Sequence, residues 1–321
     1  MFRISNSRSL LSSKVLVEAE NETKRFNKLI LNDLKTNTSL ALSHIDSMKQ
    51  ANIQRDVFTY TILVQNYAKK RNFIQALKWF EAMKKDNIQP NVITYTTMIE
   101  LFSRKKDLKN VEMYHSDMIS NNIKPSIVTY NILLKAYGES KDWKSVDRIF
   151  LDLNSSLDLK PDLFIYNTLI DVYRKAGHFK KALSFYDIIN INGLSPDIIT
   201  INSIIKTYVD MGDISSPLKI LDSLPNLKIT PNLITFGTII EFYSQNGDLD
   251  NSLKYFKVMS SHNIKPDVVI YTLIINAFSA VKTIDFRPSM EDLKIVIDSA
   301  AGIGKLIIAA NLRRKMEMLQ Q

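Results

Sequence analysis

The sequence predicts an all-α fold, a right-handed superhelical solenoid of helix–turn–helix repeats, and three observations carry this prediction. Six prolines recur every 35 residues, with one step of 36. A series of aromatic or large apolar residues keeps the same spacing, and apolar residues at helical intervals fill the stretches between. The prolines are Pro90, Pro125, Pro161, Pro196, Pro231 and Pro266. A fixed period of about 20–50 residues indicates a stack of equal units rather than one globular core.

Composition excludes several classes of protein. The chain has 321 residues, of which 45% are apolar and 23% charged, enough for a large folded body. It has no cysteine, so neither a disulfide framework nor a thiolate zinc site can form. Its longest apolar runs are far shorter than the roughly 18–20 residues of a membrane span. The net charge of +9 favours a polyanionic partner such as RNA or DNA, although solubility alone would also explain it.

The first 22 residues differ in character from the rest of the chain. Met1 to Lys14 contain three basic residues and five serines, and the first acidic residue is Glu18. An acid-poor, Arg- and Ser-rich start is typical of a mitochondrial transit peptide, and the sustained apolar stretch of a secretory signal is missing. We therefore expect residues 1–22 to be a mitochondrial targeting segment and the protein to reside in the matrix. An ordinary disordered tail is the alternative.

One unit, residues 57–91, shows what each repeat contributes. Apolar residues at helical spacing predict a first helix that ends near Lys69 and a second helix that starts after Asn72. The charged residues between the two stripes indicate a turn. Pro90 ends the second helix, because the residue before a proline is pushed out of the α region. One such hairpin cannot bury its apolar face alone, so neighbouring hairpins must stack.

Further units follow the same pattern along the chain. One of them has 36 residues because of an extra residue in the connection 154–160, where an insertion is cheap. The regular units are 57–91, 92–126, 127–162, 163–197, 198–232 and 233–267. We expect an array of about seven repeats over residues 23–288, with the first and the last degenerate. Residues 289–321 are expected to form capping helices and a tail.

Several strings resemble pentatricopeptide repeats. The openings include Val92-Ile-Thr-Tyr, Ile127-Val-Thr-Tyr-Asn and Leu163-Phe-Ile-Tyr-Asn, and the closings include Asn87-Ile-Gln-Pro-Asn and Asn263-Ile-Lys-Pro-Asp. A tetratricopeptide array, which binds proteins, has a period of about 34 and a Trp-Leu-Gly-Tyr pattern that is absent here. The uniform spacing resembles the plain, P-type class of organellar pentatricopeptide repeat proteins.

The resemblance implies that the first helices line a concave groove for single-stranded RNA, with one base read per repeat. In this family the fifth and last residues of a repeat read the base, and the second residue, usually apolar, wedges between bases. The fifth positions are Asn27, Thr61, Thr96, Asn131, Asn167, Asn202, Gly237 and Thr272. The last positions are Asp56, Asn91, Ser126, Asp162, Asp197, Asn232 and Asp267. The wedge positions are Phe58, Ile93, Val128, Phe164, Ile199, Ile234 and Val269.

The residue types at these positions make chemical sense. A carboxylate only accepts hydrogen bonds and so suits the imino N–H of uracil or guanine, whereas an Asn amide suits adenine or cytosine. The family preference adds that a fifth-position Thr goes with purines and a fifth-position Asn with pyrimidines. In chain order the first six pairs then suggest U, A, a purine at the off-code Thr96/Ser126, U, U, and C or U. Gly237/Asp267 has no fifth side chain and leaves its base undetermined. For any single Asn a solvated helix face is the alternative.

Basic residues near the ends of the first helices are predicted phosphate contacts. They are Lys69, Lys70, Arg104, Lys105, Arg174 and Lys175. Elsewhere this position holds Glu139, Asp210 and Gln245, so the basic row is broken, and a solvated turn explains any one of these cations nearly as well. The in-phase tyrosines, of which Tyr60 is the first, are expected in the core between helices rather than stacked on bases.

The sequence contains no recognisable catalytic or metal-binding pattern. Its four histidines lack ligand spacing, and a zinc deaminase would need cysteines. The stretch Gly302 to Lys305 lacks the first Gly and the Ser/Thr of a phosphate loop. We therefore expect a protein that binds without catalysis and needs no cofactor or metal.

Three functions remain in view at this point. The first is sequence-specific binding of single-stranded mitochondrial RNA, in transcript stability, maturation or translation. The second is a subunit of a mitochondrial ribosome or RNA-processing complex, and the third is a protein-binding α-solenoid scaffold. The off-code residues Ser126 and Gly237 give the second some weight.

Overall fold

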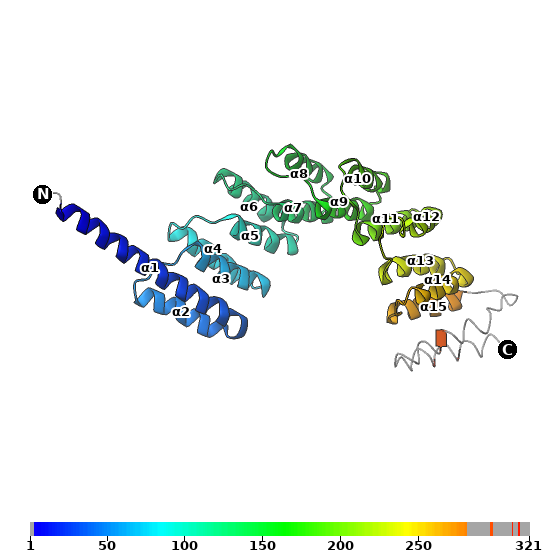
Figure 1. Cartoon of the computed structure of the whole chain (residues 1–321), viewed down its shortest axis with the longest axis horizontal. Helices are drawn as coiled ribbons and strands as arrows, with labels where there is room; N and C mark the ends of the chain where they lie inside the picture. The colour runs from blue at the N-terminus through cyan, green and yellow to red at the C-terminus, as the bar shows by residue number, and fades with distance from the viewer. Residues whose placement is uncertain (1–2, 281–295, 298–309, 311–313, 315–321) are drawn as a thin grey trace. The chain divides into compact units, whose positions relative to one another are not determined.

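The computed structural model describes residues 3–280 together with 296–297, 310 and 314, and of these the side chains of 20–277, 296–297, 310 and 314. This part of the chain contains fifteen labelled α-helices and no strand, which confirms the all-α repeat array (Figure 1). The chain divides into two compact units, residues 1–160 and 161–321, and each is described by itself.

The first unit consists of four helical hairpins. Its helices are α1 (Arg3–Thr36), α2 (Thr38–Gln50), α3 (Val57–Lys69), α4 (Phe73–Lys85), α5 (Val92–Arg104), α6 (Leu108–Ser120), α7 (Ile127–Glu139) and α8 (Trp143–Ser155). The first helix of each hairpin packs against its own second helix and against the first helix of the next hairpin. The first helices α1, α3, α5 and α7 therefore form one continuous layer within this unit.

The second unit repeats the arrangement. Its helices are α9 (Leu163–Lys175), α10 (Phe179–Ile191), α11 (Ile198–Asp210), α12 (Ser215–Ser223), α13 (Leu233–Gln245), α14 (Leu249–Ser261) and α15 (Val268–Ala280). Helices α9, α11, α13 and α15 pack in sequence as the layer of first helices. From α3 to α15 every first helix has 13 residues and begins at the first residue of its repeat.

The last residue of each repeat sets the start of the next first helix, because its side chain is the N-cap. Asp56, for example, accepts a hydrogen bond from the backbone N–H of Thr59 at 2.8 Å. Asn91, Ser126, Asp162, Asp197 and Asn232 cap in the same way. Such a cap stabilises a helix by about 1 kcal/mol. The position predicted to read bases thus also has a structural role.

From the hairpin of α3 and α4 onward, the turns inside the hairpins contain one residue in the left-handed region. In the first unit it is Arg71, Lys106 or Lys141, with φ of 56–61°. In the second unit it is Gly177, Gly212 or Gly247. A left-handed residue after the helix lets backbone N–H groups bond the last free carbonyls, so it ends the first helix and turns the chain.

The in-phase aromatic residues lie in the core, as predicted. Tyr60, Tyr95, Tyr166 and Tyr271 are almost fully buried between helices. The hydroxyl of Tyr95 donates to Asp117 Oδ2 at 3.1 Å at the edge of the core. Burial, together with this carboxylate, raises the pKa of Tyr95. These rings hold the hairpins together and are not available to stack on bases.

Two stretches differ from the regular pattern. Helix α1 runs unbroken from Arg3, so no change of secondary structure marks the predicted boundary after residue 22. Helix α12 has only nine residues, with Pro217 in its first turn, a place where the missing N–H is tolerated. No described helix combines the length and apolarity needed to cross a membrane.

Most of the predicted C-terminal region, residues 289–321, lies outside the described residues, as do residues 281–288 of the predicted array. Val296 and Ile297 are an exception. Both are buried in the apolar core of the second unit, among residues of α13, α14 and α15.

Candidate nucleic-acid interface

Apolar side chains at the wedge position of seven first helices stand in solvent. They are 48–61% exposed, although the residues that follow them in the helix are buried. They are Phe58, Ile93 and Val128 in the first unit, and Phe164, Ile199, Ile234 and Val269 in the second. Single exposed apolar residues are ordinary, but a repeated set in one register marks an interaction surface.

The fifth and last residues of a repeat form its reading pair, and in two repeats their side chains are hydrogen-bonded to each other. Asn27 Nδ2 donates to both carboxylate oxygens of Asp56, at 3.0 and 3.2 Å. In the second unit Asn202 Nδ2 donates to Asn232 Oδ1 at 3.1 Å. Four of the fifth-position side chains are buried, Asn27, Thr61, Asn131 and Asn202, which are only 4–8% exposed.

The N-cap role decides which atom of the last residue stays available. Asp197 Oδ1 accepts from the N–H of Thr200 at 2.8 Å and from its hydroxyl at 2.9 Å. Asn91 Oδ1 accepts in the same way from Thr94, at 2.9 Å in both bonds. Capping therefore leaves Oδ2 of an Asp, or Nδ2 of an Asn, available to a base. An Asp repeat offers an acceptor and an Asn repeat offers a donor.

Sequence reasoning missed a third participant, a buried threonine at the third position of the following repeat. Its hydroxyl reaches the fifth residue of the repeat before it: Thr59 Oγ1 donates to Asn27 Oδ1 at 2.6 Å, and Thr61 and Thr94 hydroxyls lie 2.9 Å apart. The set comprises Thr59, Thr94, Thr129, Thr200 and Thr235, all fully buried. Their in-phase place before the core aromatic residue was the signal that could have revealed them.

Not every predicted pair has this geometry. The Oδ1 atom of Asn167 is buried without a hydrogen-bond partner. The hydroxyl of Ser126 lies 3.0 Å from that of Thr129 and also caps α7, so little of this short side chain remains for a base. Thr272 bonds the carbonyl of Val268 in its own helix at 2.7 Å. Asn131 lies in the first unit and Asp162 in the second.

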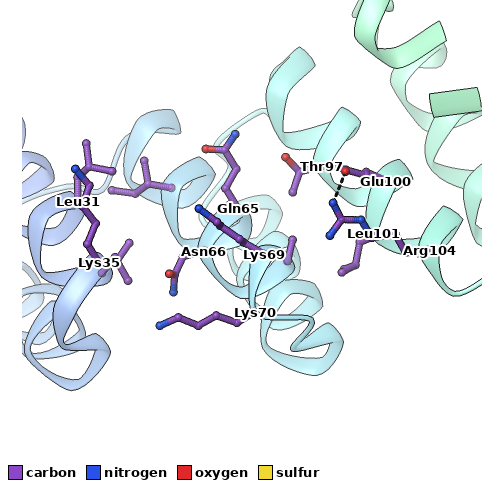
Figure 2. Close-up of a pocket in the computed structure, with 13 residues that line it drawn as sticks. Leu31, Lys35, Gln65, Asn66, Lys69, Lys70, Thr97, Glu100, Leu101 and Arg104 are labelled. Atoms are coloured by element: carbon purple, nitrogen blue, oxygen red, sulfur yellow. Dashed lines mark hydrogen bonds and ion pairs between the residues drawn. The ribbon is translucent and has the colours of Figure 1, made fainter. Parts of the chain in front are cut away.

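A cavity of about 910 Å³ opens on the first unit between the C-terminal halves of α1, α3 and α5. Four cations line it, Lys35, Lys69, Lys70 and Arg104, and we call it the basic groove (Figure 2). The Nδ2 atom of Asn66, also in its lining, is buried and has no partner. An unsatisfied donor among cations suits an anion. Lys35 was missed in the sequence, although it stands one repeat before Lys69.

The cations of the basic groove differ in whether another side chain of the protein already binds them. Arg104 pairs with Glu100 on the same helix at 2.6 Å, the interaction drawn in Figure 2. Lys70 donates to the hydroxyl of Thr38. Among the described residues, Lys35 and Lys69 have no ion pair. These two are therefore the cations most available to a phosphate. The predicted contact Lys105 lies outside the groove, with its ammonium 4.3 Å from the centre of the Phe73 ring.

The equivalent cations of the second unit are held by carboxylates. Arg174 is 12% exposed and lies 2.6 Å from Asp171 and 2.5 Å from Asp210. Lys175 also pairs with Asp171 at 2.6 Å. Burial opposes ionisation of Asp171, but the hydrogen bonds from Lys175 and Arg174 outweigh it and lower its pKa. A phosphate at this place would compete with carboxylates already bound.

The balance of basic and acidic residues also differs between the two units. Residues 23–91 contain 12 Lys or Arg and 5 Asp or Glu, whereas residues 163–267 contain 10 of each. Positive charge is thus concentrated in the first two repeats. Among the described side chains, no cluster of three or more His, Cys, Asp or Glu could hold a metal ion.

Comparison with known families identifies the repeats. The PPR repeat family matches residues 55–104, 161–210 and 231–280, the pentatricopeptide repeat domain matches residues 80–140, and the PPR repeat matches residues 128–156. Together these matches cover more than half of the chain. The protein belongs to the pentatricopeptide repeat family.

Solved structures agree with this fold. The crystal structure of the pentatricopeptide repeat protein PPR10 in complex with an 18-nt psaJ RNA element is similar with a TM-score of 0.66 and 20% identity, over 85% of this chain and 42% of that one. PPR10 from maize, in a second crystal structure, has a TM-score of 0.50 and 21% identity, over 92% and 53% of the two chains. The chain thus spans about half the length of PPR10 or less. No curated protein sequence matches it.

Proposed function

We propose that this protein binds single-stranded RNA with a preference for particular bases. The observation that carries the proposal is the row of exposed wedge residues, which recurs in the same repeats as the polar fifth and last residues. Every base has an apolar face and a polar edge, so a strand can place its faces against the wedges and its edges against the pairs. PPR10, whose fold this chain shares, is described in complex with RNA.

The atoms left free by capping support a preference among bases. Asp56 and Asp197 keep an acceptor oxygen that suits the imino N–H of uracil or guanine, and the fifth-position Asn favours the smaller pyrimidine in this family. Asn91 keeps a donor, and its partner Thr61 goes with a purine, which gives adenine. In chain order the repeats would read U, A, a purine, U, U, and C or U. The repeat of Gly237 would tolerate any base.

The basic groove supports a path for the phosphates across the first repeats. Lys35 and Lys69 are free to neutralise phosphates, and the buried donor of Asn66 gains a partner when an anion enters. Phosphate contacts position a strand without specifying its sequence. We therefore assign affinity mainly to the basic groove of the first unit and base preference to the reading pairs of both units.

The proposed setting is the mitochondrial matrix, supported by the Arg- and Ser-rich start of the sequence. There the protein would act in stability, maturation or translation of one or a few transcripts, as a P-type member of the family. It would act by occupying RNA rather than by cleaving or modifying it.

The proposal is tested with a short RNA that follows the expected order, U-A-A-U-U-C-U, offered in both polarities within an unstructured flank. The full chain should bind one polarity at least about tenfold tighter than a shuffled sequence of the same composition. Replacement of Ile93 and Ile199 by Ser should weaken binding without lowering the unfolding temperature, because both side chains are exposed. Equal binding of the ordered and shuffled RNAs would reject base-specific recognition.

A role as a subunit of a mitochondrial ribosome or RNA-processing complex is the second candidate. Ser126 and Gly237 favour it, because they interrupt the row of reading pairs and so shorten the RNA sequence that the protein can specify. Sedimentation of the tagged protein, followed by sequencing of crosslinked RNA, separates the two. A single transcript supports the first candidate, ribosomal RNA supports the second, and recovery of no RNA indicates a scaffold.

A further inference from the structure

We propose that the threonine at the third position of a repeat is a positioning residue for the reading pair of the repeat before it. It holds the fifth-position amide in place, so that the pair meets the base in one fixed arrangement. The inference rests on the proposed function, because it concerns how base preference is built. The register formed by Asn202, Asn232 and Thr235 shows it most completely.

In this register the hydroxyl of Thr235 is bonded on both sides. It donates to Asn202 Oδ1 at 2.7 Å and accepts from the backbone N–H of Asn232 at 3.1 Å. Asn202 Nδ2 in turn donates to Asn232 Oδ1 at 3.1 Å. Both ends of the Asn202 amide therefore have a partner. Thr235 is fully buried, so water cannot replace its hydroxyl.

Removal of the hydroxyl would leave Asn202 Oδ1 without a donor at a site that is 8% exposed. A buried polar atom without a partner is destabilised, so the amide would turn towards water and leave the pair. Asn232 would stay, because the backbone N–H groups of Ile234 and Thr235 hold its Oδ1 at 3.0 and 3.1 Å. The hydroxyl of Thr235 also lies 3.2 Å from Asn232 Oδ1, but this oxygen keeps two backbone donors without it, so the loss falls mainly on the fifth residue.

Of the two repeats without the threonine, one agrees with this role, whereas in the other Ile165 follows a repeat whose fifth residue, Asn131, has no threonine to hold it. The third position holds Ile in two repeats, at Ile165 and Ile270. The repeat before Ile270 has Gly237 at its fifth position, where there is no side chain to hold. At Asp197 the carboxylate takes the proton of Thr200, and Asn167 Oδ1 is left without a partner. The role therefore requires that the hydroxyl reaches the fifth residue, as that of Thr235 does at 2.7 Å, and we choose this register for the test.

The chain offers a matched control in the same helix. Thr238 is also buried, but its hydroxyl bonds the carbonyl of Ile234 at 2.9 Å and makes no hydrogen bond to a reading residue among the described side chains. Thr235→Val and Thr238→Val remove the same atom one turn apart, and Thr235→Ser keeps the hydroxyl. Each variant would be tested as the full chain against four RNAs that differ only at the nucleotide facing Asn202 and Asn232.

The spread is the ratio of the affinity for the best-bound RNA to that for the worst-bound RNA. We expect this spread to shrink about five- to tenfold in Thr235→Val, which is the effect of one lost hydrogen bond. Thr235→Ser and Thr238→Val should keep the spread of the natural chain. In the free protein, NMR should show the side-chain amide signal of Asn202 shifted towards that of a solvated amide in Thr235→Val alone.

An unchanged spread in Thr235→Val, or an equal loss in Thr238→Val, would overturn the inference. So would an Asn202 amide signal that Thr235→Val leaves in place, since this measurement involves no RNA. If the natural chain already binds all four RNAs alike, base reading at this repeat fails, and the inference fails with it. The natural chain is measured first, so this outcome is known before any variant is compared.

Discussion

A β-carbon on Gly237 would lie 3.3 Å from Cδ1 of Ile270. Ile270 takes the third position, where five other repeats have Thr, and its side chain fills the space beside the fifth position of the repeat before it. The two departures from the pattern therefore explain each other. Ile270 leaves no room for a side chain at position 237, and this repeat has no reading pair as a result.

We predict that Gly237→Asn with Ile270→Thr builds a reading pair with Asp267. Asp267 already caps α15, accepting from the N–H of Ile270 at 3.0 Å, and so stands where Asp56 stands in its own repeat. The double variant should prefer uracil at the corresponding nucleotide about tenfold, measured by gel shift with four RNAs that differ only there.

Gly237→Asn alone is the control. Its side chain meets Ile270, and overpacking of this kind destabilises a protein by about 1–3 kcal/mol, which thermal unfolding would detect. If the double variant binds the four RNAs alike, a reading pair requires more than the three residues named here.

The helix boundaries could be predicted because each repeat marks them locally. Asp56 and Asn91 stop one repeat and cap the next helix, and Pro90 ends a second helix, so the 35-residue period already places the hairpins. The wedge residues were named from the resemblance to the family. The structure shows that they are exposed, and their contact with bases stays a prediction.

The contacts between repeats could not be predicted, because they depend on packing between residues far apart in the chain. The bond from Thr59 to Asn27 joins residues 32 apart, and that from Arg174 to Asp210 joins residues 36 apart. The first adds a member to the reading site, and the second matches a charge that had been assigned to phosphate. No local pattern in the sequence distinguishes a paired arginine from a free one.

We predict that Asn167→Thr with Asp197→Asn shifts the preferred base at one nucleotide from uracil to adenine. The free Oδ2 acceptor of Asp197 becomes an Nδ2 donor, while Oδ1 continues to cap α11 through Thr200. Gel shift against the four RNAs that differ at this base measures the change, and an unchanged ranking would reject the code. Asp197→Ala should instead lose the cap and about 1 kcal/mol of stability.

We predict that deletion of about the first 20 residues leaves a folded, RNA-competent protein that stays in the cytosol. The buried residues of the first hairpin, including Ile30, Leu34 and Ala41, all remain, so its core is intact. Circular dichroism and RNA binding would check the fold, and cell fractionation the location. A truncated chain that still fractionates with mitochondria would show that targeting does not depend on these residues.

The last prediction separates the cations of the two units. Lys35→Gln with Lys69→Gln should weaken all RNAs alike and flatten the slope of log affinity against log salt by up to about two units, since neither lysine pairs with an acidic residue in the described part of the chain. The original candidates Arg104 and Lys175 should contribute less, because Glu100 and Asp171 already match their charges.

Arg174→Gln is the contrasting variant. It should lower the unfolding temperature, because it leaves Asp171 and Asp210 without the cation between them, but it should hardly change the salt slope. The base ranking should survive in all these variants, since phosphate contacts do not specify sequence. An unchanged slope in the double lysine variant would mean that the basic groove does not meet RNA. Our preference would then move to a protein-binding scaffold.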